Sequence, residues 1–318
     1  MTEEIKVRVT RRVEEAEGIC SFELVAHDGE ELPAFSAGAH IDVHVGPGLI
    51  RQYSLSNDPS ERKRYRIAVL REPASRGGSA AMHTHVQPGD VLRVSAPRNH
   101  FPLTEGPRSL LLAGGIGITP ILAMARALHT AGRPFELHYC GRSASRMAFL
   151  EELRAAAFSR NVTLHPDDDP QQKFDAAAVL ANPVHDTHLY VCGPTGFMDH
   201  VLGTARNRGW AEAQLHREYF SGTTTALATD GSFEVRLASS GLSCQVPPGK
   251  TVIEILAANG VEIPTSCEAG VCGTCLTRVL EGVPDHRDTF LTDAERTAND
   301  QFTPCCSRAL SPLLVLDL

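Results

Sequence analysis

Four cysteines have the spacing of an iron-sulfur ligand set. Cys267, Cys272 and Cys275 follow the pattern C-x4-C-x2-C, and Cys305 comes thirty residues after the third of them. Each iron of a 2Fe-2S cluster takes two thiolates besides the bridging sulfides, so a loop that presents three thiolates needs a fourth from a distant segment. The two glycines inside the loop suit a backbone that wraps closely around sulfide. The spacing therefore indicates a 2Fe-2S cluster.

Two alternatives stay open at this motif. A zinc site is the competing interpretation, although zinc modules usually pair C-x2-C with a second C-x2-C or with histidines at tighter spacing. In addition, Cys305 and Cys306 are adjacent, and spacing alone does not choose between them as the fourth ligand.

The composition is that of an ordinary globular protein with two or three domains. The chain has 318 residues, of which 42% are hydrophobic and 21% are charged. Its formal net charge is −8. We therefore expect no nucleic-acid partner and no membrane partner, since both reward basic patches.

Compartment and redox state follow from the remaining features. No run of eighteen apolar residues occurs, and the N-terminus lacks the basic-then-apolar order of a signal peptide, so we expect a cytoplasmic protein. Four further cysteines are scattered singly through apolar stretches, which favours reduced thiols. They are Cys20, Cys140, Cys192 and Cys244.

The first hundred residues are predicted to form an antiparallel β-barrel. Short alternating segments are separated by Gly, Pro and Asp clusters up to about Leu103. Many short strands with turn signals between them are typical of a closed or nearly closed barrel. The expected strands cover residues 5–9, 20–24, 40–45, 65–69 and 91–94.

Within the barrel, the segment around Arg51, Tyr53 and Ser54 could bind a cofactor. Alternation along a strand sends Arg51 and Tyr53 to one face and Ser54 to the other. The segment could hold a phosphate-bearing aromatic cofactor while the serine reaches its reactive edge. Taken alone, such a segment is more often a strand with a surface arginine.

A second feature of the barrel suits a phosphate. Arg76-Gly77-Gly78-Ser79 leads into a short predicted helix, where backbone N-H groups, a hydroxyl and a nearby arginine can bind an anion. A flexible turn with an N-cap serine explains the same residues.

From residue 109 the pattern changes to alternating strands and helices. The apolar run 109–113 suits a buried parallel strand, and it feeds a glycine turn that includes Gly115. Thr119 is predicted as the N-cap and Pro120 as the first residue of the helix that continues to Leu128. A strand, a glycine turn and a helix start form a pyrophosphate-binding unit. The turn is not the Rossmann fingerprint, because Pro120 replaces the third glycine.

Further strands and a second glycine turn follow. Cys192 ends a predicted strand and precedes Gly193, and ligands of parallel sheets bind beyond the carboxyl ends of strands. A buried structural thiol is the alternative for Cys192. The acidic residues 167–169 are interpreted as a solvated loop. The expected strands are 135–140, 162–164 and 188–192, with a helix over 147–157.

The C-terminal part is predicted as a small α+β domain after a linker over 221–231. Alternation returns at 233–237 and 242–246, and a helix over 251–259 is followed by Gly260. The cluster loop and a strand over 276–280 come next. His286-Arg287-Asp288 is interpreted as a solvated turn.

These motifs, in this order, resemble the phthalate dioxygenase reductase family, and within it the reductases of vanillate-type O-demethylases. The resemblance rests on Arg-x-Tyr-Ser at 51–54, Gly-Gly-Ser at 77–79, Gly-Gly-Ile-Gly-Ile-Thr-Pro at 114–120, Cys-Gly-Pro at 192–194 and the cluster motif. It implies an FMN-binding β-barrel over 1–104, an α/β NAD-binding domain with a parallel sheet over 105–224, and a β-grasp ferredoxin domain over 225–318.

The resemblance also implies roles for single residues, with Ser54 and Cys192 as the catalytic pair. It selects Cys305 over Cys306, so that the metal ligands are Cys267, Cys272, Cys275 and Cys305. Residues expected to hold FMN are Arg51, Tyr53, Ser54, Gly78 and Ser79. Residues expected to line the nicotinamide site are Gly115, Thr119, Cys192 and Gly193, with Phe220 expected near the flavin.

The implied function is electron transfer from NADH through FMN and a 2Fe-2S cluster to a Rieske-type oxygenase. Hydride carries two electrons and the cluster accepts one, so a flavin is needed to divide them. Two other functions stay open: an FAD-containing reductase with a different acceptor, and a non-enzymatic zinc protein. NADPH also stays open as the donor, because Arg142 and Arg146 could bind its 2′-phosphate.

Overall fold

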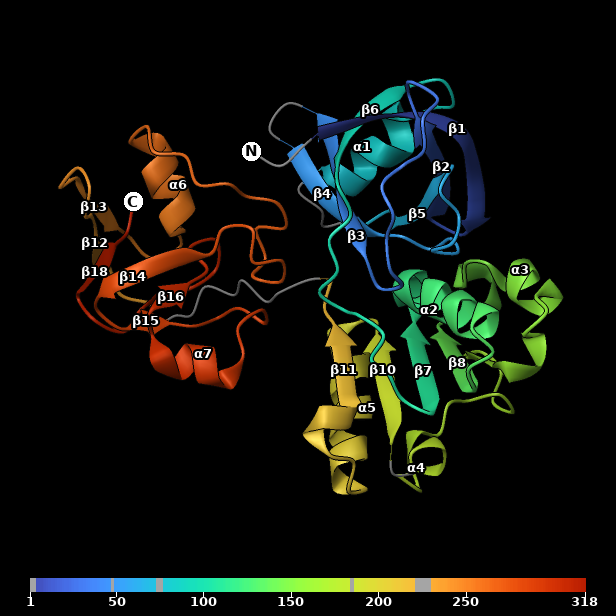
Figure 1. Ribbon diagram of the computed structural model, residues 1–318. Coiled ribbons are helices and arrows are strands. Elements are labelled where there is room, and N and C mark those ends of the chain that lie inside the picture. The colour runs from blue at the N-terminus through green and yellow to red at the C-terminus, as the bar shows by residue number, and fades with distance from the viewer. Residues whose placement is uncertain (1–3, 47–48, 73–76, 184–185, 221–229) are drawn as a thin grey trace. The chain divides into compact units, whose positions relative to one another are not determined.

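The computed structural model describes residues 4–46, 49–72, 77–183, 186–220 and 230–318 (Figure 1). The chain divides into two compact units, Met1–Glu218 and Tyr219–Leu318. The domain boundary expected at 224, and most of the expected linker, lie outside the described residues. The boundary expected near residue 104 falls inside the first unit and stays a prediction.

The first unit begins with a six-stranded antiparallel sheet in the order β4-β3-β6-β1-β2-β5. Burial alternates in parts of β1 and β6, as the sequence pattern predicts, whereas β5 and the first halves of β2 and β3 are buried on both faces. The buried side chains form one apolar core that includes Val7, Phe22 and Ile41. The helix α1 contacts β3, β4 and β5. The elements are β1 (Glu4–Ala16), β2 (Ile19–Ala26), β3 (His40–Gly46), β4 (Leu49–Ser54), β5 (Tyr65–Leu70), α1 (Gly78–His85) and β6 (Val91–Ser95).

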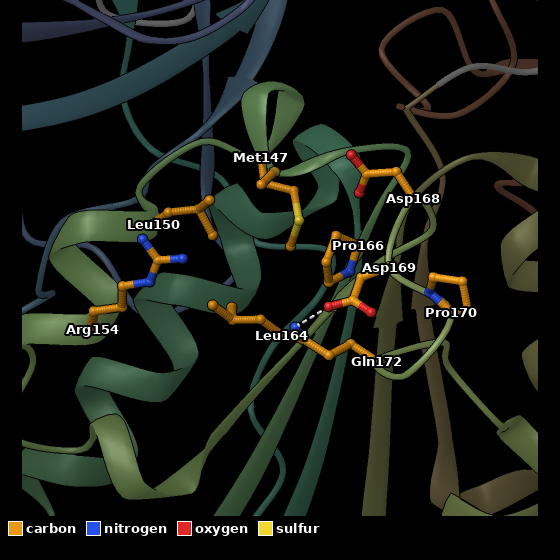
Figure 2. A pocket seen from close by; sticks show the side chains of 10 residues that line it. Met147, Leu150, Arg154, Leu164, Pro166, Asp168, Asp169, Pro170 and Gln172 are labelled. Carbon is orange, nitrogen blue, oxygen red and sulfur yellow. Dashed lines mark hydrogen bonds between the residues drawn. The ribbon is translucent and has the colours of Figure 1, made fainter.

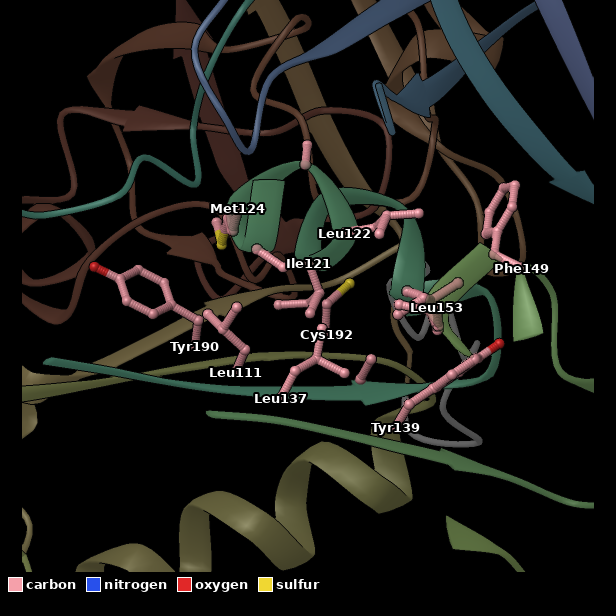
Figure 3. Packing of buried hydrophobic residues seen from close by; sticks show 14 of the residues in the cluster. Leu111, Ile121, Leu122, Met124, Leu137, Tyr139, Phe149, Leu153, Tyr190 and Cys192 are labelled. Carbon is pink, nitrogen blue, oxygen red and sulfur yellow. The ribbon is translucent and has the colours of Figure 1, made fainter. Parts of the chain in front are cut away.

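A five-stranded parallel sheet follows, in the order β11-β10-β7-β8-β9. Its central strand β7 is buried throughout the predicted apolar run. The helix α2 packs Ile121 and Leu122 over Leu111 and Leu137 on one face, and α5 covers the other (Figures 1 and 3). The elements are β7 (Arg108–Gly114), α2 (Ile118–Thr130), β8 (Phe135–Gly141), α3 (Leu150–Ala155), β9 (Val162–Pro166), α4 (Ala176–Val179), β10 (Thr187–Cys192), α5 (Thr195–Asn207) and β11 (Leu215–Glu218).

The two sheets of the first unit are joined by a buried ion cluster. Arg66 of β5 donates to both carboxylate oxygens of Glu152 in α3, at 2.6 and 3.2 Å, and stacks over the Phe149 ring at 4.6 Å. Arg126 of α2 pairs with the same carboxylate. Buried charges are tolerated when they are paired and hydrogen-bonded, so this cluster fixes the barrel against the parallel sheet.

Two helix predictions are wrong at their N-terminal ends. Thr119 is not the N-cap of α2, because the helix begins at Ile118 after Gly117, and the Thr119 hydroxyl donates to the Ile116 carbonyl at 3.0 Å. The helix expected from Met147 begins only at Leu150, since Phe149 takes the left-handed conformation with φ of 63°. A left-handed residue cannot continue a right-handed helix.

The second unit contains a five-stranded sheet in the order β13-β12-β18-β14-β16 and a two-stranded sheet of β15 and β17. Thr251 caps α6 through the backbone N-H of Glu254, and Gly260 follows the helix with φ of 79°. The elements are β12 (Phe233–Leu237), β13 (Ser243–Val246), α6 (Val252–Ala258), β14 (Thr277–Glu281), β15 (Pro284–Asp285), α7 (Asp293–Ala298), β16 (Gln301–Phe302), β17 (Arg308–Ala309) and β18 (Leu313–Leu316).

The interpretation of His286-Arg287-Asp288 as a solvated turn is wrong. The Asp288 side chain is 0% exposed and that of His286 is 9% exposed. The tripeptide lies beneath the cluster loop, where Thr289 donates its N-H to the Gly270 carbonyl at 2.9 Å.

No disulfide joins any of the nine cysteines, all of which lie within the described residues. Among the described residues, no helix has the length and apolar character needed to cross a bilayer.

Candidate functional site

Arg51 of β4 crosses the beginning of α1, where the sequence predicts a phosphate. A Cβ atom on Gly78 would lie 2.5 Å from Cγ of Arg51, so only glycine lets the arginine side chain pass at this point. Gly77, the N-cap, is left-handed with φ of 92°. A guanidinium beside the free N-H groups of a helix start attracts an anion, and a cofactor phosphate fits this place.

Tyr53 leaves an unused donor beside this anion site. Within the described chain its buried hydroxyl has no hydrogen-bond partner, and burial raises the pKa of Tyr53 above its usual value. A buried phenol normally finds a partner, so the group fits a bound aromatic cofactor that supplies one.

Ser79 is placed less favourably than expected. Its hydroxyl oxygen accepts the N-H of Glu72 at 3.1 Å. Its role toward FMN stays a prediction, and Arg76 of the same turn lies outside the described residues.

Replacing Arg51 with glutamine should weaken FMN binding by about ten- to a hundredfold, because a charge-assisted bond to phosphate contributes roughly 1.5–3 kcal/mol. Fluorescence titration of flavin-free protein with FMN measures this effect. Riboflavin, which has no phosphate, should bind both proteins equally. Arg93→Gln, at the exposed end of the same barrel, serves as the matched control.

The two predicted glycine turns meet at the carboxyl edge of the parallel sheet. A Cβ on Gly117 would lie 2.2 Å from the Cys192 carbonyl oxygen, and one on Gly193 would lie 2.9 Å from Cα of Gly114. The ends of β7 and β10 therefore approach each other through backbone alone. Gly115 at this edge is left-handed, with φ of 53°, and a Cβ on it would meet no atom within 4 Å. Gly115, Cys192 and Gly193 are thus brought together, whereas the Thr119 hydroxyl is used inside its own helix.

Glu218 connects the two expected catalytic residues. It ends β11 directly opposite Cys192 in the strand register, and Ser54 Oγ donates to its Oε2 at 3.3 Å. Burial raises the pKa of Glu218 to about 8, and the Ser54 hydrogen bond opposes this only in part. Burial and the neighbouring Glu218 raise the pKa of the Cys192 thiol. The site therefore joins a hydroxyl to a protonated carboxyl, and the Cys192 side chain packs in the neighbouring apolar core (Figure 3).

His40 lies against the same carboxyl without forming an ion pair. Its Nδ1 is 4.0 Å from Glu218 Oε1, but burial, together with Arg98 and His100, lowers the pKa of His40 to about 4. The two groups do not form an ion pair at neutral pH, because a neutral imidazole and a protonated carboxyl carry no net charges to attract each other. Sequence reasoning missed Glu218, whose only signal was its position at the end of the last strand of the sheet.

Glu218 should make the stability of the flavin-free protein depend on pH. Because its folded-state pKa of about 8 lies above the ordinary value of 4.5, the folded chain keeps a proton that the unfolded chain releases. Stability therefore falls as pH rises between these values. Glu218→Gln should gain on the order of 2–3 kcal/mol relative to wild type between pH 5.5 and 7.5, measured by urea unfolding. Parallel pH profiles for the two proteins would refute the assignment.

A cavity of about 400 Å³ lies at the same edge of the sheet, beyond the ends of β8 and β9. Met147, Leu150 and Leu164 line it opposite the loop that carries Asp168 and Asp169 (Figure 2). Neither Arg142 nor Arg146 belongs to its lining, and Arg146 pairs with Glu17 at 3.3 Å. The loop expected to be merely solvated thus contributes to a cavity of the size that small ligands occupy.

The four predicted ligand cysteines form two pairs in the second unit. The sulfur of Cys267 is hydrogen-bonded to that of Cys272, and the sulfur of Cys305 to those of Cys275 and Cys306. In the described part of the chain, no three His, Cys, Asp or Glu side chains surround a single metal-ion position. Two pairs of thiols match the two irons of a 2Fe-2S cluster, each of which takes two.

The loop around these sulfurs is held by N-H donors and by glycines. Ala269 donates its N-H to Cys267 at 3.3 Å, and Thr274 donates to Cys272 at 3.4 Å. Such bonds favour thiolates, the form that binds iron. Gly273 is left-handed, and a Cβ on it would lie 2.3 Å from the Phe290 ring.

Cys306 lies between Cys305 and the cluster loop, and its sulfur is hydrogen-bonded to that of Cys305. Its sulfur lies 3.2 Å from the Thr303 hydroxyl, and a Cβ on Gly270 would come within 2.4 Å of it. It packs beside Cys275 and Cys305 without being paired to a loop cysteine. Cys305 as the fourth ligand stays a prediction, favoured by its hydrogen bond to Cys275, which Cys306 does not share.

Phe220 is 39% exposed at the beginning of the second unit. Its place near the flavin stays a prediction.

Comparison with known proteins agrees with both parts of this site. Residues 235–310 match the family model of the 2Fe-2S iron-sulfur cluster binding domain, and residues 111–202 match that of the oxidoreductase NAD-binding domain. The chain is 57% identical to vanillate O-demethylase oxidoreductase of Pseudomonas putida over 98% of each chain. This chain belongs to the phthalate dioxygenase reductase family.

Two further relatives are similar to this chain over almost its whole length. A solved structure of phthalate dioxygenase reductase, described as modular for electron transfer from pyridine nucleotides to [2Fe-2S], has a TM-score of 0.79 and 40% identity, and the match covers 99% of this chain and 98% of that one. The heme-dependent oxidative N-demethylase beta subunit of Ectopseudomonas mendocina is 42% identical over 94% of this chain and 93% of its own. The predicted fold class is confirmed, and the protein is an oxidoreductase with NAD-binding and 2Fe-2S domains.

Proposed function

We propose that this protein is the reductase component of a Rieske-type oxygenase or O-demethylase, which delivers electrons from NADH one at a time through FMN and a 2Fe-2S cluster. The observation that carries the proposal is the hydrogen bond from Ser54 to Glu218, which joins the flavin strand β4 to the carboxyl edge of the nucleotide sheet, where Glu218 is opposite Cys192 in the strand register. A hydride donor and a hydride acceptor have to meet at such a place. The paired cysteines of the second unit supply the one-electron site.

The FMN assignment rests on Arg51, Gly78 and Tyr53, which provide a phosphate site and an unused buried donor next to it. When bound, a flavin accepts hydride and releases its electrons singly. Ser54 would orient the reactive edge through its hydroxyl, and the protonated Glu218 would hold a proton beside it. Extracting the flavin and separating FMN from FAD by chromatography decides between them.

For the nucleotide, the glycine turns would hold the pyrophosphate and the cavity beyond β8 and β9 would hold the adenosine end. Asp168 and Asp169 at this cavity disfavour a 2′-phosphate, and they outnumber Arg154, the one cation among the described residues that line it. This balance of charge favours NADH as donor. Asp168→Asn should raise kcat/KM for NADPH relative to NADH by about three- to tenfold, since one exposed charge contributes about 1 kcal/mol. Asp167→Asn, an exposed neighbour outside the cavity lining, should leave the ratio unchanged.

The acceptor assignment rests on similarity, because the 57% identical relative is a vanillate O-demethylase oxidoreductase. A haem protein is the second candidate, favoured by the 42% identity to a heme-dependent N-demethylase subunit. Mixing NADH and the reductase with either kind of purified partner, and recording the Rieske EPR signal or the haem Soret band, separates the two. Reduction of the haem partner alone would overturn the Rieske assignment.

The cellular setting completes the proposal. With a net charge of −8, the protein suits neither a nucleic-acid partner nor an anionic membrane surface. We place it in the cytoplasm, where NADH is available.

A further inference from the structure

The segment from His286 to Leu291 connects the two parts of the cluster site. Thr289 donates its N-H to the Gly270 carbonyl of the three-cysteine loop at 2.9 Å. At the other end, Arg287 donates its N-H to Ser307 Oγ at 3.1 Å, beside the turn that carries Cys305. The Phe290 ring lies against Gly273. The segment thus forms a floor that contacts both the three-cysteine loop and the turn that carries Cys305.

Asp288 places a buried carboxylate in this floor. Its Oδ2 accepts the N-H groups of Phe290 at 3.0 Å and Leu291 at 2.7 Å. Its side chain is 0% exposed, and its nearest cation, Arg296, lies at 3.8 Å. This separation neutralises the charge only in part, because the same Nη2 of Arg296 donates its hydrogen bond to the Asp288 main-chain carbonyl and not to the carboxylate.

The second oxygen of Asp288 is unsatisfied. Among the described residues, Oδ1 has no hydrogen-bond partner, and neither has His286 Nδ1, 3.8 Å away. Buried polar atoms without partners are costly and uncommon. The two backbone N-H bonds account for Oδ2 but not for the burial of Oδ1. This points to a role for Asp288 besides closing the turn.

Asp288 contacts Gly270, and the Gly270 backbone is hydrogen-bonded to a ligand sulfur. Its Cα and Cβ lie 3.0 and 3.1 Å from the position of a Cβ on Gly270, so the two residues are in direct contact. The Gly270 N-H donates to the sulfur of Cys305. The buried carboxylate therefore lies only one peptide unit from a sulfur of the cluster site.

We propose that the Asp288 carboxylate lowers the reduction potential of the cluster and so makes it a stronger electron donor. One-electron reduction adds one negative charge to the cluster, and a buried negative charge nearby opposes this addition. Arg296 acts in the opposite sense, as the partial counter-charge. The inference rests on the cluster assignment of the proposed function, and it extends that function to the direction in which electrons leave.

The test is an EPR-monitored redox titration of the full-length protein with chemical mediators, which needs neither NADH nor an oxygenase. Asp288→Asn keeps an acceptor for both backbone N-H bonds and removes the charge. It should raise the midpoint potential by at least about 40 mV, which is about a fivefold change in the one-electron equilibrium constant. Arg296→Gln should shift the potential in the negative direction. Asp300→Asn, an exposed acid of the same unit, should leave it unchanged.

The outcomes are distinct. Asp288→Asn with full iron content and the wild-type potential would overturn the proposal, because Asp288 would then only stabilise the turn. If Asp288→Asn fails to hold the cluster, Arg296→Gln decides: a negative shift supports the charge effect and an unchanged potential refutes it. A wild-type protein without a 2Fe-2S EPR signal would instead refute the proposed function.

Discussion

Replacing Cys305 with alanine is expected to lower the rate of NADH-dependent cytochrome c reduction by about a hundredfold or more. The sulfur of Cys305 is paired with that of Cys275 and receives the Gly270 N-H. Without it, one iron keeps a single protein thiolate, and a site with a missing ligand loses its cluster. Reduction of ferricyanide by NADH, which the flavin can carry out alone, should stay within about twofold of wild type. Iron content and the visible spectrum measure the loss of the cluster directly.

Cys306→Ala is the matched control. The residue is adjacent, similarly buried and chemically identical, yet its sulfur contacts the Thr303 hydroxyl instead of a loop cysteine. This variant should keep its iron and its cytochrome c activity. The opposite result, loss of the cluster with Cys306→Ala and retention with Cys305→Ala, would reverse the ligand assignment.

Ser54→Ala is expected to slow flavin reduction by NADH about a hundredfold. Its hydroxyl donates to Glu218, which lies opposite Cys192 at the edge of the nucleotide sheet. Removing it leaves a buried carboxyl without its donor and the flavin edge without a positioned hydroxyl. Positioned proton donors and acceptors typically contribute 10²- to 10⁴-fold. Rapid mixing with NADH, followed at the flavin absorbance, measures the rate of this step.

Two variants test whether the effect is local. Glu218→Gln should slow the same step, while Glu212→Gln, an exposed glutamate that precedes β11, should have no effect. A Ser54→Ala protein that binds NADH normally and reduces its flavin at the wild-type rate would remove Ser54 from the catalytic site.

The sequence was informative where local pattern and burial agree. The apolar run of β7 and the alternation in the barrel strands predict their elements, because side-chain periodicity reports the buried face directly. The cluster ligands are also readable, because thiolate spacing is dictated by the cluster itself.

The rest depends on contacts between distant segments. Glu218 belongs to no motif, and only the meeting of β4, β10 and β11 makes it part of a site. Asp288 looks like a surface acid until the fold places Gly270 over it. Phe149 takes a left-handed conformation because Arg66 and the surrounding core hold it there, which no local propensity predicts. In each case contacts between distant segments, and not the local sequence, set the position of the residue.

The most direct test of the whole account is rapid mixing of the purified protein with NADH, with the flavin and cluster absorbances recorded together. The account predicts that the flavin is reduced first and that the cluster follows within the same turnover, before any external acceptor is reduced. Repeated turnover of an acceptor with a bleached flavin and a cluster that stays oxidised would contradict it.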